Sequence, residues 1–434
     1  MRKALFTALA FSAVFSSSVA AQDQVEQTAW KRYLLELHDH FCGEVTPCTD
    51  VHIPTSTIEA EWSGDTVGRL NLHTLADPIP APGLVQRRTS FNFGSEFQRF
   101  ADNIDYTPRI TSPALQSQVR AARKVYDRET TRFLTLSRNN DGEWKTFNES
   151  QAALPRFQQK TRLQWSAQYA PKEYTARQTA AASKQSWDSM VQKTYPGQVG
   201  TWLDSAKNPA LETAVDSAGQ SVDVYPYLVN GNLEDFRRQS REALTGDDWQ
   251  PERRIAVKAS RSTTDFEQKS GGLTLGVEFD NFSLDLSGRR MSFSRHITAN
   301  NQSMEIGFGR TKTFTVTPGR WFNSGLISEF GQGPFFNKPA KPYFGASGMM
   351  PARVHEIIVG YRPTVLVELT AGELSEAQTI SAGGGGLKIG PFRIGGSGSK
   401  LKYTKVESAG GNLYRLFDDS DRVYIIAMRS LPLQ

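Results

Sequence analysis

The spacing of apolar residues changes near residue 250, and this change constrains the fold more than any other feature of the chain. Before it, apolar side chains recur at three- and four-residue intervals, as in Trp30, Leu34 and Leu37, which is the period of an α-helix. After it, apolar and polar residues alternate, as in 273–279 and 304–308, which is the period of a strand. We therefore predict an α+β fold. A mostly helical N-terminal half with a few strands precedes an all-β C-terminal domain, built as a sandwich or barrel.

Several segments of the N-terminal half have the sequence pattern of helices. Ser112 and Pro113 form the clearest start, because a capping side chain precedes a proline at the first helical position. The alternating runs 58–62 and 67–72 favour strands instead. The predicted helices cover residues 24–40, the segment that begins at Pro113, and residues 155–169, 171–194 and 233–244.

The first 21 residues have the layout of a cleavable signal peptide. Arg2 and Lys3 precede an apolar run over residues 4–14, and small side chains lead to Ala20 and Ala21. The apolar run is shorter than the roughly 20 residues that a membrane-spanning helix needs, which disfavours an uncleaved anchor. We therefore expect cleavage after Ala20 or Ala21, and a mature chain that is secreted or periplasmic.

The rest of the sequence contains no apolar run long enough to predict a transmembrane helix in the mature chain. Its length allows two or three domains at about 150 residues each. The change of period near residue 250 marks the expected boundary. We predict a signal peptide over 1–21, a mostly helical domain with some strands over 22–248 and an all-β domain over 249–434.

The two cysteines, Cys42 and Cys48, lie close together with Gly43 and Pro47 between them. In an oxidising compartment, such a pair predicts a disulfide that closes a small loop. A metal or redox pair is the alternative. The spacing differs from C-x-x-C, however, and the sequence has no second cysteine pair to complete a zinc site. We therefore predict a disulfide between Cys42 and Cys48.

The sequence contains no strong catalytic or cofactor-binding motif. A G-x-S-x-G turn is absent, and the glycine run 383–386 lacks the G-K-[ST] ending of a phosphate-binding loop. The net charge of +5 is modest and no dense block of lysine and arginine occurs, which argues against nucleic acid as a partner. We expect no cofactor, and the sequence leaves open whether the chain is an enzyme.

Four histidines support an enzymatic alternative, a secreted hydrolase that depends on a divalent metal. His38 and His40 are two positions apart, and His52 and His73 follow downstream. On a strand, residues two positions apart share a face and can bind one ion. On the predicted helix over 24–40 they diverge, and there histidines suit the negative end of the helix dipole.

A proline-rich segment with four aromatic residues, 335–344, is the strongest candidate for a ligand surface. Aromatic side chains on a loop can stack on a carbohydrate or an apolar ligand, although such rings also pack against the edge of their own domain. We predict an exported, soluble binding or interaction protein whose β domain presents this surface to a glycan, a lipid or an envelope protein. The predicted ligand-binding residues are Trp321, Phe335, Phe336, Lys338, Tyr343 and Phe344.

A glycine- and serine-rich amphipathic segment, 383–399, supports a third alternative, a membrane-active protein. Apolar residues alternate there with polar residues and glycines, as in hairpins that pore-forming proteins insert into bilayers. An ordinary exposed hairpin explains the same pattern. The cations Lys388, Arg393 and Lys400 oppose deep insertion, at about 2–4 kcal/mol each near the bilayer midplane.

Overall fold

The computed structural model describes residues 27–433 with several gaps. The predicted signal peptide over 1–21 and Cys48 lie outside the described residues, so export and the disulfide stay predictions. The gaps are residues 44–49, 55–57, 82, 85, 87, 153, 155–157, 195–197, 217–218, 247–248, 259–261, 264–265, 267–281, 287–288, 293–302, 383–385, 390–391, 396–400, 406–412 and 419.

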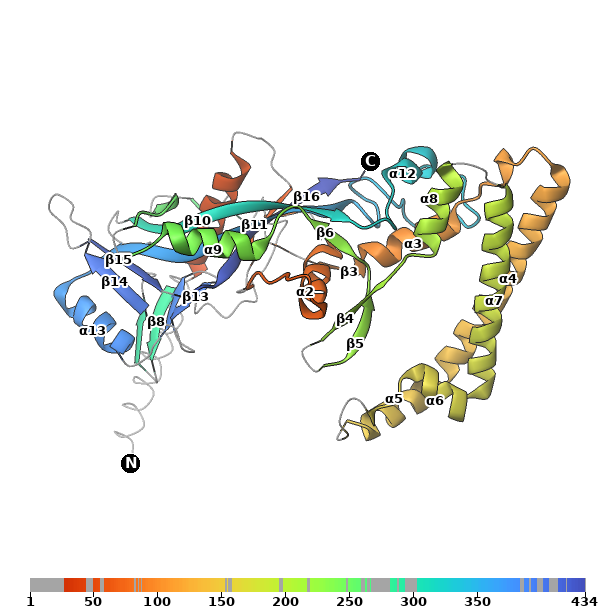
Figure 1. Ribbon diagram of the computed structural model, residues 1–434, viewed down its shortest axis with the longest axis horizontal. Helices are drawn as coiled ribbons and strands as arrows, with labels where there is room; N and C mark the ends of the chain where they lie inside the picture. The colour runs from red at the N-terminus through yellow and green to blue at the C-terminus, as the bar shows by residue number, and fades with distance from the viewer. Residues whose placement is uncertain are drawn as a thin grey trace, which may run out of the picture.

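The molecule is elongated, with a curled antiparallel sheet at one end and a pair of long helices at the other (Figure 1). Three long strands, β10 (Ser303–Pro318), β11 (Ala352–Glu368) and β16 (Val423–Pro432), run along it toward the helical end. The helices α4 (Pro113–Asn139) and α7 (Pro171–Thr194) project from that end, and we call them the arm. This arrangement confirms the predicted α+β class, with a mostly helical N-terminal half and a curled sheet of C-terminal strands.

Among the described residues, the largest sheet has eight strands, with β10 and β11 paired at its centre. Both strands change partner along their length. β10 pairs with β7 (Arg253–Lys258) near its start and with β6 (Tyr227–Val229) near its end. β11 pairs with β16 and with β15 (Leu413–Asp418), which also pairs with β14 (Leu401–Lys405). The sheet therefore forks around one long strand pair.

Two short segments of the N-terminal half join this sheet. β1 (Val51–His52) pairs with β16, and β6 pairs with β10. Two separate ribbons flank it, β2 (Pro78–Pro80) with β3 (Arg88–Asn92), and β4 (Glu212–Val215) with β5 (Ser221–Val224). The predicted domain boundary between residues 248 and 249 stays a prediction.

A smaller four-stranded sheet has the order β13, β12, β8 and β9. β12 (Gly386–Ile389) and β13 (Phe392–Gly395) pair as an antiparallel hairpin, as the alternating pattern of 383–399 predicts. β8 (Phe282–Leu286) pairs with β12 and with β9 (Arg289–Ser292). The alternating run 273–279 lies outside the described residues. α13 (Ala371–Ala382) follows β11 in the chain and precedes β12.

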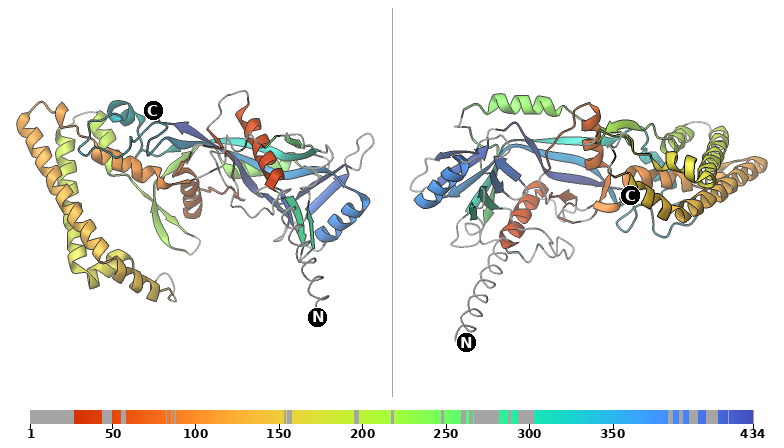
Figure 2. Two further views of the ribbon diagram at one scale, coloured as in Figure 1. Left: turned by 180° about the vertical axis from the view of Figure 1, so that it is seen from behind. Right: turned by 90° about the horizontal axis from the view of Figure 1, so that it is seen from below.

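The arm confirms the clearest helix predictions. Ser112 caps α4 by accepting a hydrogen bond from the Leu115 N–H at 3.4 Å, and α7 begins at Pro171 as its sequence predicts. Two short helices, α5 (Asp141–Ser150) and α6 (Arg162–Tyr169), lie at the far end of the arm (Figure 2). α6 starts later than the predicted residue 155, because Thr161 and Gln164 form a capping box there.

The remaining helices cover the body of the molecule, and one of them corrects a prediction. Residues 67–72, predicted as a strand, belong to the helix α2 (Thr66–Ala76). The Asp65 carboxylate accepts a hydrogen bond from the Gly68 N–H at 2.7 Å, and this cap starts the helix despite the alternating pattern. The other predicted strand, 58–62, contributes only an isolated bridge between Glu59 and Tyr424. The other helices are residues 27–42, α3 (Phe93–Asn103), the 3₁₀ turn η1 (Thr107–Arg109), α8 (Gln198–Lys207), α9 (Leu233–Ala243) and α12 (Ser324–Phe330).

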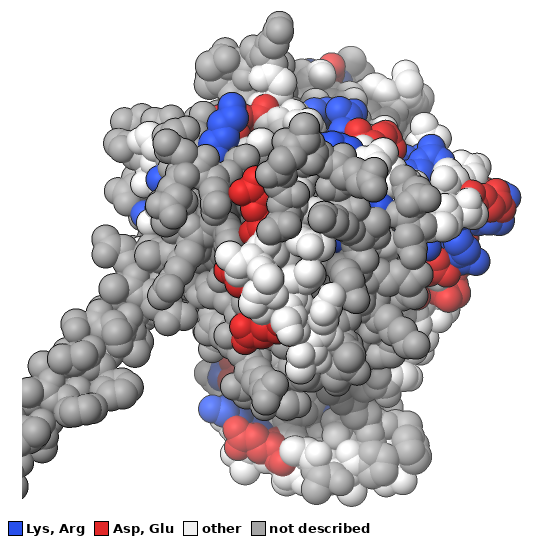
Figure 3. All heavy atoms as spheres, turned by 90° about the vertical axis from the view of Figure 1, so that its left-hand side faces the viewer, with Lys and Arg blue, Asp and Glu red and all other residues white. Residues whose placement is uncertain are grey.

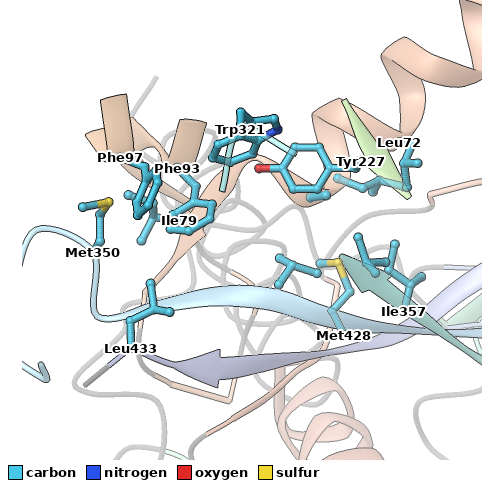
Figure 4. Close-up of a cluster of buried hydrophobic side chains, with 14 of the residues drawn as sticks. Leu72, Ile79, Phe93, Phe97, Tyr227, Trp321, Met350, Ile357, Met428 and Leu433 are labelled. Carbon is cyan, nitrogen blue, oxygen red and sulfur yellow. The ribbon is translucent and has the colours of Figure 1, made fainter. Parts of the chain in front are cut away.

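Two apolar cores hold these elements together. In one, the helix of residues 27–42 lies against the sheet (Figure 2). Its Trp30, Tyr33 and Leu34 share a buried cluster with residues of the sheet. In the other, Phe93 and Phe97 of α3 and Trp321 face the strands β11 and β16 (Figure 4).

None of the described helices combines the length and hydropathy that a membrane span requires. At the sheet end of the molecule, the described basic and acidic side chains are intermixed (Figure 3).

Candidate binding cleft at the root of the arm

The aromatic residues that the sequence assigns to ligand binding pack largely into the core. Trp321 and Tyr343 are each 3% exposed, and Phe344 is buried as well. The Trp321 ring packs against Phe93 at 5.6 Å between centroids, and its indole N–H donates to the Pro226 carbonyl at 2.9 Å. These rings therefore stabilise the fold, which is the alternative that the sequence leaves open.

The half-buried Phe335 and Phe336 begin the loop that joins this core to the arm. The Asn103 side chain at the end of α3 fixes the loop: its Oδ1 accepts from the Asn337 N–H at 2.9 Å, and its Nδ2 donates to the Asn337 carbonyl at 2.7 Å. The same amide donates to the Tyr343 hydroxyl at 3.1 Å. The Asn103 backbone carbonyl also accepts from the Phe336 N–H. Asn103 therefore fixes the segment 336–343 through three side-chain contacts and one backbone contact.

A cleft of about 520 Å³ opens between this loop, α3 and α4. Two of the predicted ligand-binding residues, Lys338 and Tyr343, line this cleft. The other predicted residues do not line it. We call it the root cleft, because it lies where the arm leaves the body. Its described lining residues are Ser95, Gln98, Arg99, Asp102, Asn103, Arg123, Tyr126, Asn337, Lys338, Pro339, Ala340, Tyr343 and Met349.

The described lining of the root cleft has an excess of positive charge. Three cations, Arg99, Arg123 and Lys338, line it together with one carboxylate, Asp102. Arg99 is exposed and forms an ion pair with Glu96 at 3.0 Å on the adjacent turn of α3. Burial raises the pKa of Asp102, offset in part by the neighbouring Lys207 and Lys184. An anionic group is therefore the ligand that this lining favours.

Arg123 is a nearly buried cation of the cleft lining. Its guanidinium stacks on the rings of Trp187 and Phe336, at 4.3 and 4.9 Å from their centroids. It also donates to the Asp127 carboxylate at 2.9 Å and to the Asp102 carbonyl. A guanidinium fixed in this way loses little side-chain entropy when it binds an anion.

A buried ionic cluster lies behind the cleft and joins α3, α7 and α8. Lys207 Nζ lies 3.2 Å from Asp188 Oδ1, and Lys184 Nζ lies 3.0 Å from Asp188 Oδ2 and 3.7 Å from Asp102 Oδ1. Burial lowers the pKa of Lys207 to about 8, partly offset by the two aspartates. Four charges from three helices therefore tie the arm to the body.

The histidines proposed as metal ligands do not converge. His52 is buried and uses both ring nitrogens, donating from Nδ1 to the Gly83 carbonyl at 2.9 Å and accepting at Nε2 from the Ser430 hydroxyl at 3.0 Å. His73 lies on α2, where its Nδ1 donates to the Tyr225 carbonyl at 3.2 Å. His38 is buried beside Cys42, whereas His40 is exposed. Within the described ranges, no group of three or more potential ligands is placed to hold a metal ion.

The membrane-active alternative rests on side chains outside the described part of the chain. The backbone of β12 and β13 forms the predicted hairpin, but residues 383–385 and 396–400 lie in the gaps. The backbones of Lys388 and Arg393 lie opposite each other in this hairpin. Membrane insertion by this segment therefore stays a prediction.

Most residues of the root cleft were missed by the sequence analysis. Residues 95, 98, 99 and 102 recur at three- and four-residue intervals, so they form one polar stripe along α3 opposite its phenylalanines. A helical interpretation of this segment would have predicted such a polar face. Arg123 gave no comparable signal, because it is one of many cations along α4.

Comparison of the chain with protein-family models, with curated proteins and with solved structures found no match. The geometry of the root cleft therefore carries the functional argument.

Proposed function

We propose that this chain is an exported binding protein whose root cleft holds an anionic ligand. The observation that carries the proposal is the set of three cations, Arg99, Arg123 and Lys338, in one cleft with a single buried carboxylate. Charge-assisted hydrogen bonds from such groups are about twice as strong as neutral ones. The signal-peptide pattern of residues 1–21 supports an extracytoplasmic setting for the ligand.

The other lining residues narrow the ligand to a carboxylate carried on a sugar or peptide framework. The planar guanidinium of Arg123 matches the two oxygens of a carboxylate. Gln98 and Ser95 offer hydrogen bonds beside it, while Tyr126 offers an aromatic edge. Acidic glycans and acidic peptide segments of envelope proteins share this chemistry, and a binding experiment separates them.

The test is a calorimetric titration of the mature protein at low ionic strength. Its ligands are oligosaccharides of uronic acids, their neutral counterparts, acidic and neutral peptides, and vesicles of anionic lipid. We expect one carboxylate-bearing class to bind and its neutral counterpart to fail. Binding should weaken as salt rises, because exposed charges are screened over about 10 Å at 0.1 M ionic strength. Equal binding of charged and neutral ligands would contradict the proposal.

Variants locate the binding in the cleft. Lys338→Ala and Arg99→Ala each remove one cation and should weaken binding by about tenfold or more, which corresponds to roughly 1.4 kcal/mol. Lys341→Ala is the matched control, because Lys341 is an exposed lysine on the same loop that does not line the cleft. A loss of affinity in the control equal to that of Lys338→Ala would place the ligand elsewhere.

A further inference from the structure

The short strand β6 is the last strand on its side of the large sheet. It pairs with β10 through Val229 with Val316 and Leu228 with Thr317, and the described sheet continues no further beyond it. An edge strand carries backbone N–H and C=O groups that can pair with another chain. β6 has Pro226 before it and no charged residue within it to block such pairing.

The hydrogen bonds to β10 show which backbone groups face outward. The Asn230 N–H donates to the Thr315 carbonyl at 3.0 Å, and the Gly319 N–H donates to the Pro226 carbonyl at 2.8 Å. In an antiparallel pair, alternate residues direct their backbone groups to the partner. The backbone groups of Tyr227 and Val229 therefore face away from β10.

A groove of about 440 Å³ lies along this outward edge. Gly68, Arg69 and Leu72 of α2 also line it, and the His73 ring of α2 donates to the Tyr225 carbonyl just before β6. The start of α9 closes one end, where Gly231 has a positive φ of 112° and Asn232 caps the helix. Its described lining residues are Trp62, Ser63, Gly64, Gly68, Arg69, Leu72, Glu212, Val224, Tyr225, Pro226, Tyr227, Leu228, Val229, Gly231, Asn232, Leu233 and Glu234.

Buried contacts fix the edge in position. The Tyr227 hydroxyl donates to the buried Asp77 carboxylate at 2.9 Å, and the Trp321 indole donates to the Pro226 carbonyl at 2.9 Å. Tyr227 points toward Trp321 in the core beneath the strand (Figure 4). A partner that binds this edge therefore meets a preformed surface, and only the partner loses much conformational freedom.

We infer that this groove binds an extended peptide segment of another protein, which adds one strand beside β6. Strand addition uses main-chain hydrogen bonds for affinity and alternate side-chain contacts for selectivity. Leu228 is 61% exposed at the centre of the strand, so an apolar residue of the peptide packs on it. Glu212 forms an ion pair with Arg69 and Glu234 forms one with Arg237, so the charges of the lining are compensated and an uncharged, apolar-rich peptide suits the groove. This occupant differs from the acidic ligand of the root cleft, and the two proposals stand separately.

The experiment selects random octapeptides displayed on phage against the full mature chain. Selected peptides are then titrated against the wild type, Val229→Pro and Leu228→Lys. Val229→Pro removes an N–H that faces the groove and keeps the pairing with β10, and Leu228→Lys changes an exposed side chain. Leu134→Lys on the arm is the matched control, since Leu134 is 45% exposed and lies outside the groove. Circular dichroism shows whether each variant folds.

We expect peptides with alternating apolar residues, and a loss of affinity of about tenfold or more in either folded groove variant, with the control unchanged. Amide exchange at Tyr227 and Val229 should slow when the peptide binds. If no selected peptide distinguishes the wild type from the folded groove variants, the proposal is wrong. Self-association of the wild type that Leu228→Lys abolishes, measured by sedimentation without any peptide, would overturn it in favour of a second copy of this chain.

Discussion

The ammonium of Lys207 lies 3.4 Å from the centre of the Trp187 indole ring, and this contact joins α8 to α7 at the root of the arm. Lys207 is 2% exposed, so its charge is removed almost entirely from water. The neighbouring Asp102 and Asp188 carboxylates offset only part of that cost, because burial still lowers the pKa of Lys207 to about 8.

This lowered pKa predicts a pH dependence of stability. Between about pH 8 and 10.5, Lys207 in the folded chain has lost its proton, whereas the unfolded chain still binds it. Stability rises with pH wherever the unfolded state binds more protons. We expect Lys207 to add about 1–2 kcal/mol to the free energy of unfolding between about pH 8 and 9.5. Urea denaturation of the wild type and Lys207→Met at several pH values measures this rise as their difference.

Lys184→Met is the control for that prediction. The pKa of Lys184 is raised by Asp102 and Asp188 against the opposing effect of burial, so this lysine stays protonated in both states below about pH 9.5. The rise of unfolding free energy with pH should therefore persist in Lys184→Met, somewhat reduced because the Lys184 charge helps to lower the pKa of Lys207, and disappear in Lys207→Met. Tyrosines such as Tyr227, whose pKa burial raises, oppose the effect above about pH 10, which is why the upper limit is set below that value.

A second prediction concerns the bond between Tyr227 and Asp77 beneath β6. The Asp77 Oδ1 atom is buried and accepts from the Tyr227 hydroxyl at 2.9 Å and from the Gly94 N–H at 2.8 Å. Tyr227→Phe leaves this carboxylate with one donor fewer and should cost about 1–3 kcal/mol of unfolding free energy. Tyr225→Phe removes a more exposed bond to Gln98 and should cost less than half as much. Equal losses in urea denaturation would show that burial of Asp77 is not the cause.

A pair of glycines provides a third prediction. A Cβ atom on Gly94 would lie 2.4 Å from the Tyr225 ring, whereas one on Gly142 would meet nothing within 4 Å. Gly94→Ala should therefore destabilise the fold by about 1–3 kcal/mol through overpacking. Gly142→Ala, on the exposed helix α5, should stabilise it by about 0.5–1 kcal/mol through helix propensity. Thermal melting of both variants checks the opposite signs, and destabilisation by both would contradict the local geometry.

The sequence predicts the elements whose patterns are local. The helix α7 begins at Pro171 and β10 alternates apolar and polar residues near Phe314 and Val316, because a single element determines those signals. It does not predict that β10 changes partner from β7 to β6, since pairing over long separations leaves no local pattern. Residues 67–72 show how local signals conflict: one capping bond from Asp65 outweighs their alternation.

The candidate site was predictable only in part for a related reason. Lys338 and Tyr343 lie in a segment whose composition is unusual, and both line the root cleft. Arg99, Asp102 and Arg123 come from two helices that meet the segment only in three dimensions. The aromatic residues that the sequence assigns to ligand binding are mostly buried, because large rings contribute to a core at least as often as to a surface.

The last prediction tests how the root cleft is built. Asn103 is 7% exposed and its amide makes three hydrogen bonds to the loop, so Asn103→Ala leaves the Asn337 backbone groups without their partner. We expect a loss of about 1–3 kcal/mol in unfolding free energy, and faster cleavage within 336–343 by a protease under native conditions. Asn337→Ala is the matched control: its hydrogen bonds to Asn103 come from the backbone, and its side chain is exposed. The control should keep wild-type stability and cleavage. If both variants are cleaved at the wild-type rate, other contacts hold the loop, and the affinity of the root cleft should then survive Asn103→Ala as well.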